Sequence, residues 1–229
     1  MEVERISTGC ESIDKLLNGG IEKRIITNVY GESGTGKTNF CIQIAAQVTE
    51  NNGKVAFIDS EAGFSPERFL QMTDQENLDN IYLENPTDFE EQQSSIQSLK
   101  KLVEDKNIDL IIVDSAVSLY RLQVNGENAS EINQKLSQQL SILSKLARKN
   151  NIPVIITNQV YTSFDEEELE LVGRDVPKYW SKCLLKISKK ENKIREIEVD
   201  KHRSIKEGEK TQFKITEEGL ESVENESLL

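Results

Sequence analysis

GESGTGKTN, residues 31–39, is the most informative stretch of this chain. It matches the pattern G-x-x-x-x-G-K-[ST] at full spacing, with one additional glycine inside it. Glycines let backbone N–H groups curl around phosphate oxygens without a Cβ in the way. We therefore predict a phosphate-binding loop (P-loop) for a nucleoside triphosphate, formed by Gly31, Glu32, Ser33, Gly34, Thr35, Gly36, Lys37, Thr38 and Asn39.

The segments on either side of this loop have the character that the motif requires. Residues 25–31 are an apolar run of strand length, and residues 37–53 have the pattern of a helix that ends at Asn and Gly. Such a helix presents its positive N-terminus to the phosphates. We expect Lys37 to reach the β- and γ-phosphates and the Thr38 hydroxyl to coordinate Mg²⁺. The strand–loop–helix context argues against a chance glycine-rich turn.

Short apolar runs alternate with amphipathic helical runs along the chain. We predict further strands over 54–59, 80–85, 110–115 and 153–159. We predict further helices over 65–73, 87–107 and 129–151. This alternation indicates an α/β fold, with a mainly parallel twisted sheet flanked by helices and right-handed crossovers. Residues 183–219 contain successive strand-like runs that predict a C-terminal antiparallel extension, and we expect an acidic frayed tail from about residue 217.

Polar side chains follow three of the predicted strands, at the edge where parallel sheets bind ligands. Asp114 is expected to hold Mg²⁺ through water, with a strand-end turn as the alternative. Glu61 follows the 54–59 strand, which we expect beside the P-loop strand, and can orient or deprotonate the attacking water. Asp59 competes for that role, and a helix-capping Glu61 stays open. Gln159 carries an amide, which is no strong base, so we interpret it as a γ-phosphate sensor rather than a turn residue.

Composition excludes several classes of protein. The 229 residues suit one large α/β domain, and 36% hydrophobic with 30% charged residues is typical of a soluble globular chain. No run is long and apolar enough to span a membrane, and the polar N-terminus is unlike a signal peptide, so we expect a cytoplasmic protein. His202 is the sole histidine, which excludes a multi-histidine metal site. The net charge of −12 argues against strong non-specific binding to nucleic-acid phosphates.

The motifs together resemble the RecA/RadA recombinase superfamily. The similarity runs, in order, through STGCESIDKLLNGGI (7–21), the P-loop, IDSEAGFSPERF (58–69), LIIVDSAVSLYR (110–121), IPVIITNQV (152–160) and GEKTQFKITEEG (208–219). It covers nearly the whole chain and is strongest to the short archaeal RadA paralogues. The resemblance implies a single RecA-like ATPase core domain over residues 1–229, with ATP and Mg²⁺ as its ligands.

The resemblance also implies roles for individual residues. Glu61 matches the family's catalytic glutamate, and Gln159 matches the glutamine that links the γ-phosphate to the second DNA-facing loop. Arg68 matches an arginine that packs on the adenine ring, consistent with guanidinium stacking. Arg121 matches a basic residue at the start of the first DNA-facing loop. DKHRS (200–204) resembles the K-x-R ends of related ATPases, in which Lys201 and Arg203 would reach the nucleotide of a neighbouring subunit; a solvated basic turn is the alternative.

Three departures from the family pattern bear on function. The family pattern starts at the first residues, so we expect neither an N-terminal helical DNA-binding domain nor a linker that carries a polymerisation motif. Glu127 stands where the recombinases carry a second arginine. The second loop, within residues 160–175, is rich in carboxylates, which repel DNA phosphates. That loop is either solvated or a docking surface for a basic partner.

These features favour a nucleotide-switched recombination mediator with weak, DNA-independent ATPase activity. Its expected partners are a RadA-type recombinase or another repair protein, weakly bound single-stranded DNA, and further copies of the chain in a nucleotide-dependent assembly. A DNA-dependent ATPase that pairs strands is the alternative. A RecA-like signalling or clock ATPase that never meets DNA is the third interpretation.

Overall fold

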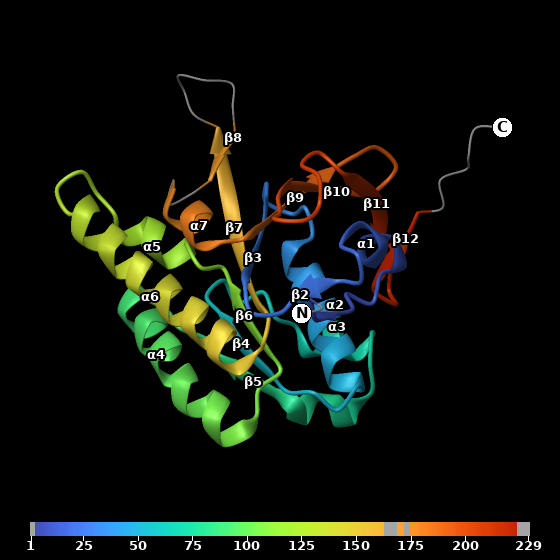
Figure 1. Ribbon diagram of the computed structural model, residues 1–229, viewed down its shortest axis with the longest axis horizontal. Helices are drawn as coiled ribbons and strands as arrows, with labels where there is room; N and C mark the ends of the chain where they lie inside the picture. Colours follow the sequence, from blue (N-terminus) through green and yellow to red (C-terminus); the bar gives the residue numbers. More distant parts are fainter. Residues whose placement is uncertain (1–2, 163–168, 172–174, 224–229) are drawn as a thin grey trace.

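The computed structural model describes residues 3–162, 169–171 and 175–223. One long twisted sheet lies between two groups of helices, which gives three layers (Figure 1). One face is covered by α1 (Glu11–Leu16), α2 (Lys37–Glu50), α3 (Pro66–Leu70) and the short 3-10 helix η1 (Gln75–Asn80). The other face is covered by α4 (Phe89–Lys106), α5 (Ser118–Gln123), α6 (Ala129–Asn150) and α7 (Asp175–Trp180).

The main sheet has the strand order β12-β11-β10-β9-β3-β7-β6-β4-β5, with β8 paired to β7. Its parallel half consists of β3 (Ile26–Gly31), β4 (Val55–Asp59), β5 (Ile81–Glu84), β6 (Leu110–Asp114), β7 (Val154–Thr162) and β9 (Cys183–Lys189). The antiparallel strands are β8 (Leu169–Leu171), β10 (Ile194–Lys201), β11 (Lys210–Ile215) and β12 (Leu220–Ser222). The predicted α/β fold with a C-terminal antiparallel extension is confirmed.

One prediction about strand order is wrong. We expected the strand that precedes Glu61 to lie beside the P-loop strand, but β7 and β6 lie between β3 and β4. β6 and the first five residues of β7 are buried on both faces, and such strands take the centre of a parallel sheet. Glu61 nevertheless lies near the P-loop, since its charge raises the pKa of Lys37.

The predicted helices lie within a few residues of the observed ones. α4 and α6 end at asparagines in the left-handed conformation, Asn107 (φ 54°) and Asn151 (φ 56°), which asparagine tolerates better than most residues. Ile132, Leu136, Leu140, Leu143 and Leu146 lie three or four positions apart and form the buried face of α6. The three cysteines are buried and free. Within the described residues, no helix is long and apolar enough to cross a membrane.

The C-terminal region differs from the prediction. We expected a frayed tail from about residue 217, yet β12 pairs with β11 and extends the sheet. Leu220 anchors this last strand because its side chain is buried beside Phe213 in the core under α2. The sequence analysis also missed the ribbon of β1 (Arg5–Ile6) and β2 (Ile21–Glu22), which is too short to show a pattern.

Candidate nucleotide site

The P-loop runs from the end of β3 at Gly31 to the start of α2 at Lys37. Two of its glycines are required by geometry. A Cβ at Gly31 (φ 156°) would lie 2.2 Å from the carbonyl oxygen of Ile187, and one at Gly36 (φ 105°) would lie 2.6 Å from Ile215. A side chain at Gly31 would collide with the backbone of β9, and one at Gly36 would require both a strained backbone and a shift of Ile215. Its N–H groups and the N-terminus of α2 form a cradle that fits a phosphate chain.

Lys37 folds back over this loop. Its Nζ donates hydrogen bonds of 2.9 Å to the carbonyl oxygens of Gly31 and Glu32. Burial lowers the pKa of the Lys37 ammonium, while the carboxylates of Asp114 and Glu61 oppose that shift. A largely buried cation that is held by carbonyls alone, with acidic groups nearby, is suited to receive an anionic ligand.

Asp114 ends β6 and is almost fully buried, with 3% of the residue exposed. The Thr157 hydroxyl donates to its Oδ1. The other oxygen, Oδ2, is buried without a hydrogen bond of normal geometry, and the Thr38 hydroxyl lies close enough to lower the pKa of the carboxyl. Burial is the larger influence and raises that pKa overall.

These oxygens fit a magnesium ion. Hydroxyl and carboxylate oxygens are hard donors, and an orphaned buried carboxylate oxygen gains from a cation. Within the described residues, no group of three or more His, Cys, Asp or Glu side chains could hold a metal. A cation between Thr38 and Asp114 would therefore need phosphate oxygens and water to complete its shell, which is how Mg²⁺ binds beside nucleotides.

Glu61 and Gln159 meet at the same edge of the sheet. Gln159 Nε2 donates to Glu61 Oε1 at 2.9 Å, across 98 positions of sequence. Burial raises the pKa of the Glu61 carboxyl, and the charge of Asp114 raises it further. A raised pKa makes a carboxylate a better proton acceptor near neutral pH. The arrangement joins the predicted water-activating group to the predicted γ-phosphate sensor.

Asp59, the competitor of Glu61, is committed elsewhere. Its carboxylate accepts from the backbone N–H groups of Glu61 (3.2 Å), Gly63 (3.1 Å) and Phe64 (2.7 Å). Asp59 is also buried. It therefore shapes the turn that carries Glu61, and both of its oxygens accept from that turn. This geometry favours Glu61 over Asp59 and over a purely capping Glu61.

Arg68 connects three segments on the P-loop side. Its Nε donates to Asn39 Oδ1 at 2.8 Å, and Nη1 donates to Gln71 Oε1 and to the carbonyl oxygen of Glu217. Arg68 thus lies next to the last residue of the predicted loop. A guanidinium held in this way presents a flat face, which suits stacking on a base.

Lys201 and Arg203 lie away from the P-loop of their own chain. β10 begins beside the P-loop, where Arg195 Nε donates to the Thr35 carbonyl, and it ends at Lys201. Lys201 Nζ donates to the carbonyl oxygens of Lys178 and Ser181 at the end of α7. Arg203 forms an ion pair with Glu22. The structure therefore does not bring these two cations to the nucleotide site of the same molecule.

The predicted DNA-facing positions lie near α5 and β8. Arg121 is exposed in α5, next to Leu122, which is 81% exposed. Glu127 is exposed in the loop between α5 and α6. The carboxylates at 165–168 of the second loop lie outside the described residues. Arg121 is thus accessible, as a contact with DNA would require.

Sequence reasoning missed three residues of this site. Thr157 holds Asp114, Lys189 lies beside Gly34 with its Nζ 3.1 Å from where a Cβ would stand, and Arg195 holds the loop carbonyl of Thr35. Thr157 directly follows the apolar residues Val154, Ile155 and Ile156. A hydroxyl at that place in a central strand was a usable signal of a site residue. The two cations lie in a lysine-rich strand region, where nothing in the sequence distinguishes them from solvated residues.

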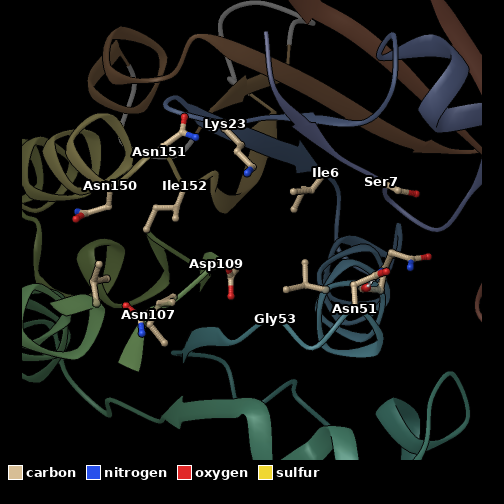
Figure 2. A pocket seen from close by; sticks show the side chains of 14 residues that line it. Ile6, Ser7, Lys23, Asn51, Gly53, Asn107, Asp109, Asn150, Asn151 and Ile152 are labelled. Atoms are coloured by element: carbon tan, nitrogen blue, oxygen red, sulfur yellow. Dashed lines mark hydrogen bonds between the residues drawn. The ribbon is translucent and has the colours of Figure 1, made fainter. Parts of the chain in front are cut away.

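A separate cavity of about 570 Å³ lies at the opposite, amino-terminal edge of the sheet (Figure 2). Lys23, Gly53, Asp109 and Ile152 line it, and each precedes a parallel strand. The residues that follow α2, α4 and α6 also line it, so three helices end there. Helix C-termini repel anions, so this cavity is unsuited to a triphosphate.

Comparison with known proteins agrees with the geometry. The family model for Rad51 matches residues 1–223. The DNA repair and recombination protein RadB of Methanococcus maripaludis strain C7 is 42% identical over 216 residues, which are 92% of this chain and 98% of that protein. RadB of Thermococcus onnurineus is 40% identical and covers 95% and 97% of the two chains. A crystal structure of the RadB recombinase superimposes with a TM-score of 0.83 at 38% identity, covering 96% of this chain and all of that one.

Proposed function

The chain belongs to the Rad51 family, and we propose that it is an ATP-binding recombination mediator whose nucleotide controls contacts with other molecules. The observation that carries this proposal is the convergence of Lys37, Asp114, Glu61 and Gln159 on one P-loop. These groups come from four separate strands and loops. Their meeting is what ATP binding and hydrolysis require.

Each side chain has a defined task in this proposal. Lys37 exchanges its loop carbonyls for β- and γ-phosphate oxygens, and Thr38 and Asp114 would hold Mg²⁺. The ion would supply neutralisation of phosphate charge when bound. Glu61 takes a proton from the attacking water, and Gln159 fixes the Glu61 carboxylate through its 2.9 Å hydrogen bond. A ligand that accepts a hydrogen bond from Gln159 would weaken its bond to Glu61. It would thereby change the conformation of β7 next to Val160, where the pairing with β8 begins.

We favour a switch over a DNA-driven motor. The net charge is −12, and the sequence of the second loop, residues 160–175, is rich in carboxylates, which repel DNA phosphates. Bound ATP would instead stabilise one conformation, by roughly 2.7 kcal/mol at an ATP concentration about 100-fold above Kd. The partners consistent with this role are a RadA-type recombinase or another repair protein, single-stranded DNA held weakly near Arg121, and further copies of this chain.

The placement of Arg203 supports assembly in a head-to-tail sense. A group that serves a neighbour's nucleotide must lie away from the P-loop of its own chain, or copies could not repeat in one direction. β10 supplies this separation. It begins near the P-loop, where Arg195 contacts the Thr35 carbonyl, and runs toward the amino-terminal edge of the sheet. Arg203 is the better candidate of the pair, because 57% of its side chain is exposed although it pairs with Glu22. Lys201 is bound to two carbonyl oxygens.

The proposal is tested by steady-state ATP turnover with and without single-stranded DNA at low salt. We expect slow turnover that DNA does not change, together with an ATP-dependent change in mass or in binding to a RadA-type recombinase. Strong stimulation by DNA would favour a DNA-dependent recombinase instead. Nucleotide binding with no response to DNA, recombinase or chain concentration would favour a signalling ATPase.

A further inference from the structure

A buried carboxylate lies beneath the proposed trans-acting arginine. Glu22 ends the short strand β2, and only 1% of its side chain is exposed. Its Oε1 accepts from Arg203 Nη2, although 181 positions separate the two residues. The charges of Glu22 and Arg203 therefore link the N-terminal ribbon to the segment between β10 and β11.

The only histidine completes this cluster. His202 Nε2 lies 3.4 Å from Glu22 Oε2, and 3% of the histidine side chain is exposed. His202 Nδ1 accepts from the backbone N–H of Ser204 at 3.1 Å, so its Nε2 carries the proton that faces Glu22. Burial lowers the pKa of His202, and the charges of Arg5 and Arg203 also lower it while Glu22 opposes them.

Three consecutive residues are thus fixed within the same chain. Lys201 binds the end of α7, and His202 and Arg203 both contact Glu22. Yet the Arg203 side chain remains 57% exposed. A guanidinium has five N–H donors in a rigid fork, so a bond to Glu22 through Nη2 leaves others directed outward.

Burying a carboxylate costs free energy unless a partner charge or hydrogen bonds compensate for the lost water. An ion pair of this kind contributes little to stability on balance, because desolvation offsets most of the attraction. The ion pair instead fixes the conformation of the Arg203 side chain. A free arginine side chain loses rotamer entropy when it is fixed, and a buried anchor removes most of that loss beforehand.

We propose that Glu22 is a positioning residue for Arg203, which it fixes so that the exposed guanidinium donors face the nucleotide of the next copy. This inference rests on the trans-acting role of Arg203 in the proposed function. It makes the β1–β2 ribbon part of the machinery that senses a neighbour's nucleotide.

The test compares Glu22→Gln, Arg203→Ala and the double variant with wild type. Association in the presence of ATP and Mg²⁺ is measured by light scattering against chain concentration. ATP affinity of the dilute, unassociated chain is measured separately by calorimetry. Glu4→Gln is the matched control, since Glu4 is an exposed ribbon carboxylate that pairs with Lys23 and Asn151. Glu22→Asp keeps the charge but shortens the reach, and it replaces Glu22→Gln should that variant fail to fold.

We expect Glu22→Gln to weaken ATP-dependent association about tenfold and to leave ATP affinity unchanged. The double variant should associate no more weakly than Arg203→Ala alone, a result that a merely structural Glu22 would not produce. Normal association of Glu22→Gln beside weakened Arg203→Ala would overturn the positioning role only. Normal association of Arg203→Ala, or ATP-independent association of wild type, would overturn the trans-acting role and this inference with it.

Discussion

The two edges of the parallel sheet differ in what they are built to receive. At the carboxyl-terminal edge, α2 begins and presents N–H groups, and Lys37 lies over the loop. At the amino-terminal edge, α2, α4 and α6 end, and the cavity of Figure 2 is lined by the residues that cap them. The polarity of the helices thus assigns anion binding to one edge and excludes it from the other.

The edges also differ in how their residues come together. The P-loop is one contiguous stretch, and its partners lie near the carboxyl ends of strands. Asp114 ends β6, Glu61 follows β4, and Gln159 lies in β7 level with the end of β3. Near the amino-terminal edge, Glu22 and Arg203 meet across 181 positions. The K-x-R pattern marks Arg203, but no motif marks Glu22 as its partner. Chemistry that depends on a local backbone shape leaves a signature in sequence, whereas chemistry that depends on two distant elements leaves almost none.

The largest expected effect follows from removing the cation over the loop. Lys37→Ala should abolish ATP-dependent stabilisation, a loss of roughly 2.7 kcal/mol at an ATP concentration about 100-fold above Kd. Thermal unfolding with and without ATP and Mg²⁺ measures it. Lys23→Ala, which removes a lysine from the amino-terminal edge, is the control and should keep the full shift. An equal loss in both variants would break the distinction between the edges.

The next effect concerns hydrolysis. Glu61→Gln should retain ATP binding and slow turnover by about 10²–10⁴-fold, because an amide cannot accept the proton from water. Phosphate release under saturating ATP measures the rate, and Glu67→Gln on the neighbouring helix is the matched control. Unchanged turnover in Glu61→Gln would place the base elsewhere.

A smaller effect tests the buried carboxylate of Asp114. Burial raises the pKa of Asp114 in the folded chain, so the cost of its ionised form is fully present at neutral pH and is relieved as pH falls through the raised value. Asp114→Asn should therefore stabilise the nucleotide-free chain by about 1 kcal/mol at neutral pH and less in acid, while it loses stabilisation by Mg²⁺ and ATP. Denaturant unfolding at both pH values measures this, and a variant less stable than wild type at neutral pH would contradict it.

The smallest effect concerns the base of the nucleotide. Arg68→Ala should weaken ATP binding by about threefold, since a stacked guanidinium contributes about 0.5–1 kcal/mol at a partly exposed site. Inorganic triphosphate serves as the comparison ligand, because it lacks the adenine ring. Calorimetry should show weaker ATP binding with unchanged triphosphate binding. Equal losses for both ligands would assign Arg68 to holding Asn39 and Glu217 instead.

Much of the carboxyl-terminal edge was predictable because its residues follow strands. Asp114 ends its strand and Lys37 begins α2, as predicted, whereas Gln159 does not end its strand, because β7 continues to Thr162. The chemical roles of all three residues stay predictions. The order of strands was not predictable, because chain order does not reveal that β6 and β7 separate β3 from β4. The ordered β12 was also missed, since a single buried leucine in an acidic segment gives no periodic signal.

β10 is eight residues long and so spans roughly 25 Å as a stiff rod. One of its ends touches the chain's own P-loop through Arg195, and the other leads to Arg203. In a head-to-tail row of copies, β10 of each copy would connect its own nucleotide site to the nucleotide site of the next copy. Such a row has the physics of a one-dimensional lattice with nearest-neighbour coupling. Its length would then respond steeply to the fraction of nucleotide hydrolysed, although no copy contacts more than two others.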